Sequence, residues 1–241
     1  MTLREGEIVG IAGVSGNGQS ELLDVLSGIM APTGGHFTVG TNQITAERPS
    51  DPAELRDFGV AHVPEDRHKC GIVLPFSAAE SMILGYSGGD EEDGSWWLSP
   101  SKLEESCAGR MREFDIRPPI PKLQSANFSG GNQQKIVLAR EISTQPKLLL
   151  VGQPTRGVDI GAIEFIHKQL IALRNEGCAI LLVSVELDEI MSLSDRILVM
   201  NNGQIVGELA REDADETALG LMMAGIGAEE KDAGSAKGAV S

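Results

Sequence analysis

The sequence predicts an α/β fold with a mainly parallel sheet, an antiparallel pair of strands at one edge and an inserted helical subdomain. Short apolar runs alternate with helical patterns near both ends of the chain. This alternation favours a parallel sheet that binds ligands at the carboxyl ends of its strands. A glycine-rich loop follows the first apolar run and opens a helix. Between residues 75 and 127 the alternation gives way to helical patterns, which indicates the inserted subdomain.

Composition limits the function classes. The 241 residues are 41% apolar, which is enough for a full core, and no apolar run reaches the roughly 20 residues of a membrane span. No leader opens the chain, so we expect this fragment to be soluble. A net charge of −15 argues against a nucleic-acid surface, because neutralising phosphates requires clustered Lys and Arg. The three cysteines lie far apart in sequence and are expected to be reduced thiols.

The first elements are a strand at 7–12, the glycine loop at 13–20 and a helix that stops near Gly28. Residues 33–44 are expected to form a turn and a strand, and 58–67 a strand that runs into a polar loop.

Helical patterns cover residues 77–86 and 101–116. The acidic, glycine-rich stretch 87–94 between them is expected to be a solvated connection. The adjacent pair Trp96–Trp97 has two interpretations, a cap on the helical subdomain or a docking point for a membrane partner.

Alternation then returns, with buried strands at 147–154 and 178–186 around a helix at 163–177. A short helix at 187–194 and a hairpin turning at Asn202–Gly203 complete the core.

The stretch "GVSGNGQS" (13–20) matches the phosphate-loop pattern G-x-x-x-x-G-K-[ST] at Gly13, Gly18 and Ser20. Gln19 stands at the lysine position. The strand before it and the helix after it are the setting in which backbone N–H groups hold an anion. An ordinary tight turn is the alternative. The predicted nucleotide-binding residues are Gly13, Gly16, Asn17, Gly18, Gln19 and Ser20. No metal ligand is predicted in this chain, with a weak contact from Ser20 as the one alternative.

Three further stretches complete a pattern: "PEDR" (64–67), "FSGGNQQK" (128–135) and "LLLVGQPTRGVD" (148–159). Together with the glycine loop they resemble the ATP-binding subunits of ABC transporters, in which "FSGGN" corresponds to the LSGGQ signature. The chain looks in particular like the second nucleotide-binding half of subunits that import simple sugars or nucleosides. The resemblance implies a P-loop NTPase fold of the ABC ATPase type, with ATP and Mg²⁺ as cofactors.

The chain departs from that family at several positions. Gly152 and Gln153 stand where the family has the Asp that holds Mg²⁺ and the Glu that polarises water. Val185 replaces a histidine near the γ-phosphate, and Glu65 replaces a glutamine. The strand that carries the adenine-stacking aromatic is missing, so the chain looks like a fragment. The resemblance therefore implies that no catalytic position is intact and that the isolated chain hydrolyses little or no ATP.

Two such halves are expected to close head to tail around ATP. The signature residues would complete the first half's site, and that half would bind most of the Mg²⁺. Glu65 and Asp159 are expected to couple the two sites, although a plain charged loop at 65–67 is the alternative. The signature residues are Ser129, Gly130, Gly131, Asn132 and Gln133.

The implied partners are the first nucleotide-binding half, membrane permease subunits and, through the permease, a substrate-binding protein. The implied location is peripheral, on the cytoplasmic face of the cell or inner membrane. The predicted divisions are a first part of the core at 1–74, the helical subdomain at 75–143, the rest of the core at 144–225 and a disordered tail at 226–241.

Two functions of other classes remain as hypotheses. A stand-alone P-loop ATPase would need a replacement for the metal ligand near Gly152, and a non-transport ABC-like module would only bind partners. No metal spacing links the histidines, so we expect no metal site among them: His36, His62, His68 and His167.

Overall fold

The computed structural model describes residues 1–86 and 99–226. Its centre is a six-stranded sheet in the order β4-β5-β6-β1-β7-β8. Neighbouring strands are parallel except for the pair β7–β8 at one edge, which is antiparallel. This confirms the predicted α/β class. The strands are β4 (Val60–Val63), β5 (Leu148–Gly152), β6 (Ala179–Ser184), β1 (Ile8–Ala12), β7 (Arg196–Asn201) and β8 (Gln204–Ala210).

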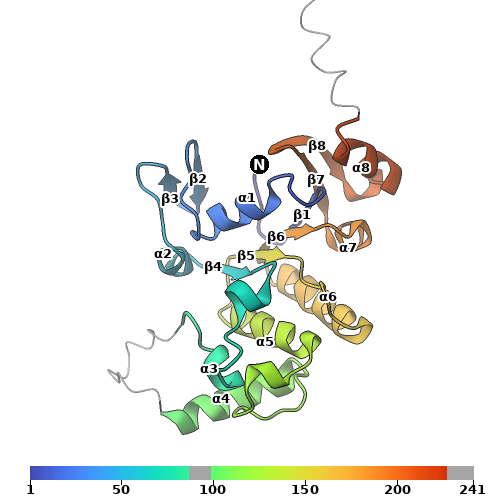
Figure 1. Ribbon diagram of the computed structural model, residues 1–241. Coiled ribbons are helices and arrows are strands. Elements are labelled where there is room, and N and C mark those ends of the chain that lie inside the picture. Colours follow the sequence, from blue (N-terminus) through green and yellow to red (C-terminus); the bar gives the residue numbers. More distant parts are fainter. Residues whose placement is uncertain (87–98, 227–241) are drawn as a thin grey trace, which may run out of the picture.

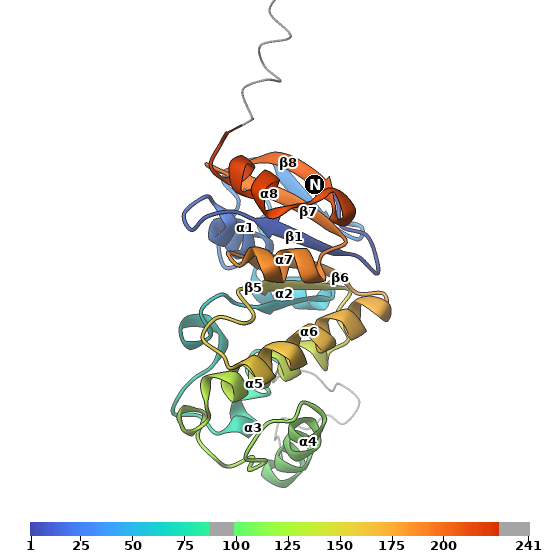
Figure 2. The same ribbon diagram turned by 90° about the vertical axis from the view of Figure 1, so that its right-hand side faces the viewer.

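Helices cover both faces of this sheet (Figures 1 and 2). One apolar cluster joins the sheet to α1 and α2, and a second joins its other face to α5, α6, α7 and α8. Every residue of β1 and β6 is buried, because two covered faces leave no polar side to the strands. The helices are α1 (Gln19–Leu26), α2 (Pro52–Asp57), α5 (Gly130–Ile142), α6 (Ile160–Asn175), α7 (Leu187–Leu193) and α8 (Glu216–Met223).

The expected turn and strand at 33–44 is a hairpin of two short strands, β2 (His36–Val39) and β3 (Asn42–Thr45). The prediction of one strand was wrong because Gly40, with φ +59°, lets the chain reverse after four residues. The hairpin lies over α1 and α2 and not in the main sheet (Figure 1).

The helical lobe extends beyond α5, at the end of the molecule opposite α8 (Figure 2). It contains α3 (Ala78–Ser81), which Ser77 and Glu80 open with a capping box, and α4 (Pro100–Glu113). The predicted helix at 77–86 was too long, since the chain leaves helical geometry before Gly85, whose φ is +87°. The acidic stretch, Trp96–Trp97 and the tail from 227 lie outside the described residues.

Sequence patterns did not indicate α2, α8 or three short turns of other helix types. These are a π-helical turn at Arg67–Gly71 and 3₁₀ turns at Ser125–Asn127 and Arg211–Asp213. Each is too short or too mixed in composition to show a hydrophobic period. Across 1–86 and 99–226, no helix combines the length and the apolarity that crossing a bilayer requires.

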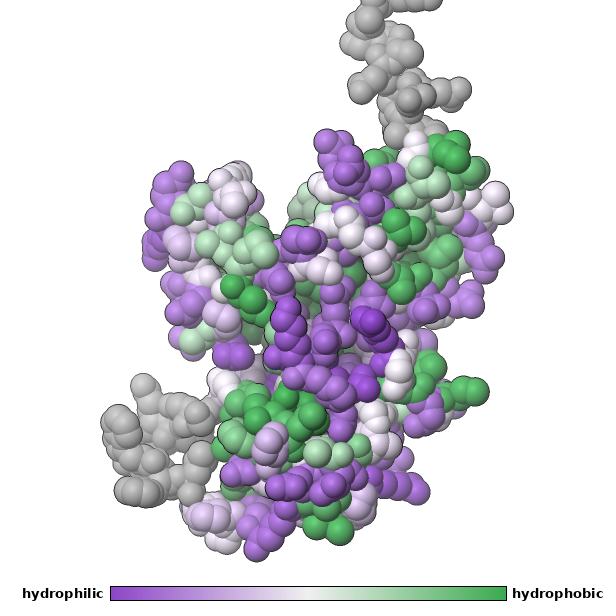
Figure 3. All heavy atoms as spheres, viewed as in Figure 1, coloured by the Kyte–Doolittle hydropathy of each residue, from purple (hydrophilic) through white to green (hydrophobic). Residues whose placement is uncertain are grey.

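A buried ion pair attaches the lobe to α5. Arg140 Nε lies 2.7 Å from Glu141 Oε1, and Arg140 Nη1 donates to the carbonyls of Gly71 and Ser81. The Tyr86 hydroxyl donates to Glu141 Oε2. The pair therefore joins the loop after β4, the lobe and α5. Hydrophilic side chains cover the middle of one face of the molecule, between sheet and lobe, while apolar side chains gather on the lobe (Figure 3).

Candidate nucleotide-binding site

The glycine loop leaves β1 at Gly13 and enters α1 at Gln19. Gly16 and Gly18 have φ values of +91° and +101°, in the left-handed region that favours glycine. Gly18 is the residue that caps α1. The loop thus places backbone N–H groups at a helix N-terminus, the arrangement that binds phosphate. The outer part of the loop is open, with nothing within 4 Å of a Cβ built on Gly16.

Asn17 has a role that the sequence did not reveal. Its Nδ2 donates to the Met200 carbonyl at 3.2 Å, and its Oδ1 accepts from the Asn202 N–H at 3.3 Å. The Gly203 N–H donates to the Asn17 carbonyl. Asn17 therefore ties the glycine loop to the turn between β7 and β8.

Gln19 points inward and is only 4% exposed. Its carboxamide lies against Gly13, so that a Cβ at Gly13 would collide with it. A lysine in this loop would carry a charge to the β- and γ-phosphates. Gln19 carries none and is folded onto the end of β1.

Ser20 and Glu65 meet at the mouth of the loop. The Ser20 hydroxyl donates to Glu65 Oε2 at 2.5 Å, and Glu65 comes two residues after β4. Both are oxygen donors, which suit Mg²⁺. Among the described residues, no cluster of three or more His, Cys, Asp or Glu side chains could hold a metal ion.

The two expected catalytic positions lie together at the ends of β5 and β6. Val185 donates its N–H to Gln153 Oε1 at 3.4 Å, and Gln153 has a left-handed φ of +47°. A glutamine side chain cannot take a proton from water, and the side chain of valine has no polar atom. Both line a cavity of about 690 Å³ that also contains Ser15.

The signature residues open helix α5. Ser129 is the N-cap, and its Oγ accepts from the Asn132 N–H at 3.4 Å and from Asn132 Nδ2 at 2.9 Å. Asn132 Oδ1 in turn accepts from the Arg117 N–H at 2.9 Å. The Asn132 amide is therefore held from both sides. Gln133 points into the protein, where it contacts His68 and the Ser125 carbonyl.

Both signature glycines are also required by neighbouring groups in this chain. A Cβ at Gly130 would lie 2.8 Å from Arg67 Nη2 and 2.9 Å from the Gly157 carbonyl. A Cβ at Gly131 would lie 2.9 Å from Asp159 Oδ2. Asp159 itself is the N-cap of α6 and accepts from the Ala162 N–H.

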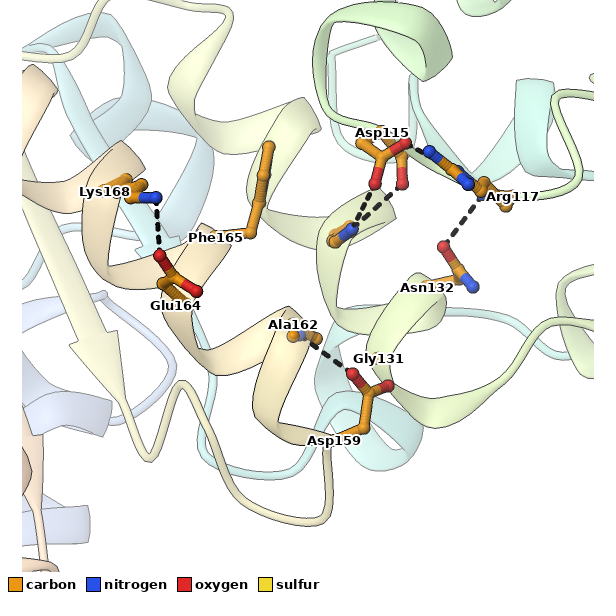
Figure 4. A pocket seen from close by; sticks show the side chains of 11 residues that line it. Asp115, Arg117, Gly131, Asn132, Asp159, Ala162, Glu164, Phe165 and Lys168 are labelled. Carbon is orange, nitrogen blue, oxygen red and sulfur yellow. Dashed lines mark hydrogen bonds and ion pairs between the residues drawn. The ribbon is translucent and has the colours of Figure 1, made fainter.

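Beside the signature lies a cavity of about 440 Å³. Figure 4 shows Asp159 next to Gly131 on one side and Asn132 directed toward Arg117 on the other. Lys135 donates to the Asp115 carbonyl at 2.9 Å, and its ammonium lies 4.5 Å from the centre of the Phe165 ring. Arg117 Nε pairs with Asp115 at 2.7 Å and holds the pKa of that carboxyl below its ordinary value.

Arg67 connects the two regions. Its Nη1 donates to the Arg156 carbonyl at 3.0 Å, so the loop after β4 is joined to the segment between β5 and α6.

Two of the histidines lie on β4 and α6, namely His62 and His167, and His167 contacts Glu189 at 3.1 Å. Burial lowers the pKa of His62 to about 4.

A parallel sheet whose first strand delivers a glycine loop to a helix N-terminus defines the class of P-loop nucleotide-binding proteins. Residues 1–156 match the ABC transporter family. The chain belongs to that family, as an ATPase domain, and the family binds ATP with Mg²⁺.

Comparison with known proteins agrees. The chain is 42% identical to the guanosine import ATP-binding protein NupO of Bacillus subtilis over 99% of its own length and 46% of the relative. It is 43% identical to the nucleoside import ATP-binding protein NupA of Lactococcus lactis, over 93% of the chain and 44% of the relative. The chain thus spans less than half the length of these curated relatives.

Solved structures show the same fold. An ABC-transporter ATP-binding cassette in its ADP conformation superposes with a TM-score of 0.71 at 22% identity, over 96% of this chain and 87% of that one. A dimeric cassette in a post-hydrolysis state with ADP and phosphate gives 0.72 at 22% identity, over 88% of each chain.

Proposed function

We propose that this chain is the second ATP-binding half of an importer for nucleosides or simple sugars, and that it completes the first half's ATP site with its signature motif. Its own site holds nucleotide without hydrolysing it. The observation that carries this proposal is the contrast between two sites. The start of α5 presents backbone N–H groups that can bind an anion, whereas at the other site the Gln153 side chain accepts a hydrogen bond from the Val185 N–H.

The signature side has the chemistry for phosphate. Helix α5 is 13 residues long, and its N-terminal N–H groups carry a partial positive charge. Ser129 and Asn132 are held by their mutual hydrogen bond at 2.9 Å, so ordering them costs little entropy on binding. Ile160 is 84% exposed beside Asp159, which is the exposure expected of a residue that a partner half covers.

The substrate class and partners come from the relatives. Proteins named for guanosine, nucleoside and glucose import are 41–43% identical to this chain over the aligned residues. Because those relatives are more than twice as long, a first ATP-binding half fits in the remainder. Permease subunits and a substrate-binding protein would be the other partners, and the chain would sit on the cytoplasmic face of the membrane.

The test is an isosteric change in the signature. In the intact transporter reconstituted in vesicles, Asn132→Asp should lower substrate-stimulated ATPase activity at least tenfold. The new carboxylate keeps the acceptor for Arg117 but meets the other half's γ-phosphate. Two unit charges near 4 Å repel by roughly 4 kcal/mol at an effective dielectric of 20.

Asn42→Asp is the matched control, because it makes the same change at an exposed position of β3. It should leave activity within twofold of the parent. Equal activity of the two variants would show that this signature takes no part in turnover.

A further inference from the structure

A buried lysine lies one turn along α5 from the signature. Lys135 follows Asn132 by three residues, so the two side chains leave the same face of the helix. Both residues line the cavity beside the signature. The Lys135 side chain is only 9% exposed, although proteins rarely bury a lysine without a partner. A charge at this depth needs compensation from neighbouring groups.

Asp115 and Phe165 compensate this charge. The Lys135 ammonium donates to the Asp115 carbonyl at 2.9 Å and to Asp115 Oδ2 at 3.4 Å. It also lies 4.5 Å from the centre of the Phe165 ring, which belongs to α6. That ring packs edge-on against the buried Phe114, with 6.2 Å between the ring centres. The ammonium therefore has a fixed place between α6 and the segment that follows α4, and it holds Asp115 there.

The backbone of Asp115 has an uncommon conformation. Its φ of +47° lies in the left-handed region, which costs free energy for a residue other than glycine. Asp115 Oδ1 also lies 2.7 Å from Arg117 Nε (Figure 4). The Arg117 backbone N–H returns to α5, where it donates to Asn132 Oδ1 at 2.9 Å. Lys135 and Asn132 thus hold the two ends of one segment, 115–117.

The Arg117 N–H decides which way the Asn132 amide faces. A backbone N–H can only donate, so the amide oxygen must face Arg117 and Nδ2 must face Ser129. Ser129 Oγ then accepts from Asn132 Nδ2 at 2.9 Å and from the Asn132 N–H at 3.4 Å. The Ser129 hydroxyl hydrogen remains available to an anion at the start of α5. An amide turned by 180° would place its oxygen next to Ser129 and accept that hydrogen.

We propose that Lys135 is a positioning residue of the signature. By holding the segment 115–117 against α5, it fixes the orientation of the Asn132 amide and so leaves the Ser129 hydroxyl free to donate. This inference rests on the proposed function, in which that hydroxyl meets the first half's γ-phosphate. It extends the functional unit from the signature to a lysine and an aspartate that act through the signature's side chains.

Hydrogen exchange in the purified chain, followed by NMR, tests the geometry without any partner. Lys135→Met keeps the length of the side chain and removes the ammonium, so the Arg117 amide proton should exchange at least tenfold faster than in the parent. Lys168→Met is the matched control, because it removes an exposed ammonium from the same cavity. In that variant the Arg117 amide should exchange within twofold of the parent.

ATP hydrolysis by the intact transporter reconstituted in vesicles tests the consequence for function. In the proposed function the first half's own loop binds most of the nucleotide, and the signature acts on the γ-phosphate after closure. Lys135→Met should therefore lower kcat at least fivefold and change the KM for MgATP less than twofold. Lys135→Arg keeps the charge, the N–H donors and the aromatic contact, so kcat should stay within twofold of the parent. Lys168→Met should also stay within twofold.

Thermal melting identifies a variant that fails to fold. Asp115→Asn then replaces Lys135→Met in both measurements, with an expected effect of at least threefold in each. Asparagine tolerates a left-handed φ but leaves the ammonium without its carboxylate. Parental exchange or parental kcat in the folded variant overturns the inference, as does a loss in Lys135→Arg equal to that in Lys135→Met.

The Asn132→Asp transporter separates this inference from the proposed function. A transporter that Asn132→Asp impairs and Lys135→Met does not impair overturns the inference alone. A transporter that Asn132→Asp leaves unaffected overturns the proposed function, whereas the exchange of the Arg117 amide is measured without the first half and does not depend on that result.

Discussion

His62 on β4 is a residue whose chemistry depends on its surroundings. Its ordinary pKa of 6.5 falls to about 4, first because of burial and then because of the nearby charges of Arg140 and Arg56. Between about pH 6.5 and pH 4, His62 is therefore protonated in the unfolded chain but neutral in the folded chain.

Because of this pKa difference, the folded state becomes less stable as the pH falls. The contribution of neutral His62 is fully present above pH 6.5 and is lost as the pH falls from 6.5 toward 4. We expect the free energy of unfolding of the parent, relative to His62→Gln, to fall by about 1–3 kcal/mol between pH 7 and pH 4.5.

Urea unfolding at a series of pH values measures this difference. His36→Gln, at an exposed position of β2, is the control and should follow the parent at every pH. A constant difference between the parent and His62→Gln would contradict the prediction.

At the scale of elements, α5 has two roles. Its first turn carries the signature, and its last turn carries the buried Arg140–Glu141 pair that attaches the lobe. The side chains of both residues are no more than 5% exposed, so each charge depends on the other for compensation.

We therefore expect Glu141→Gln to destabilise the fold by about 3–5 kcal/mol, because it leaves the Arg140 charge buried without its partner. Glu164→Gln breaks the exposed pair with Lys168, whose side chains are about 70% exposed, and should cost less than about 1 kcal/mol. Chemical denaturation compares the two. Equal losses would show that burial does not strengthen the Arg140–Glu141 pair.

At the scale of the whole molecule, we propose that the chain binds nucleotide at its own site without hydrolysing it. The glycine loop and the cavity beside Gln153 are formed, and Gln153 and Val185 occupy the two positions where the family resemblance places a glutamate and a histidine. We expect the purified chain to release phosphate from MgATP no faster than buffer does, a loss of at least ~10² from the missing base alone.

Gln153→Ala is the control, because replacing a residue that takes no part in hydrolysis does not change the rate of phosphate release. Its phosphate release should equal that of the parent. Steady turnover by the parent that disappears in Gln153→Ala would show that this glutamine is catalytic and that the site is active.

Local patterns determined most of the architecture. The alternation of apolar runs and helices, the stops at Gly28 and Gly177 and the turn at Asn202–Gly203 are short-range signals, and the structure confirms them. The phosphate loop could be predicted because it is also a short-range signal, with its glycines and its serine within eight residues.

Tertiary structure decided what happens between distant segments. No local signal links Asn17 to the β7–β8 turn, Arg67 to Arg156, or Gln133 to His68, because the sheet order brings these segments together only after the chain has folded. The same holds for the space beside Gly152. From the sequence, Gly152 ends a strand without a carboxylate, whereas in the fold the parallel pairing of β4 with β5 fills that space with Glu65.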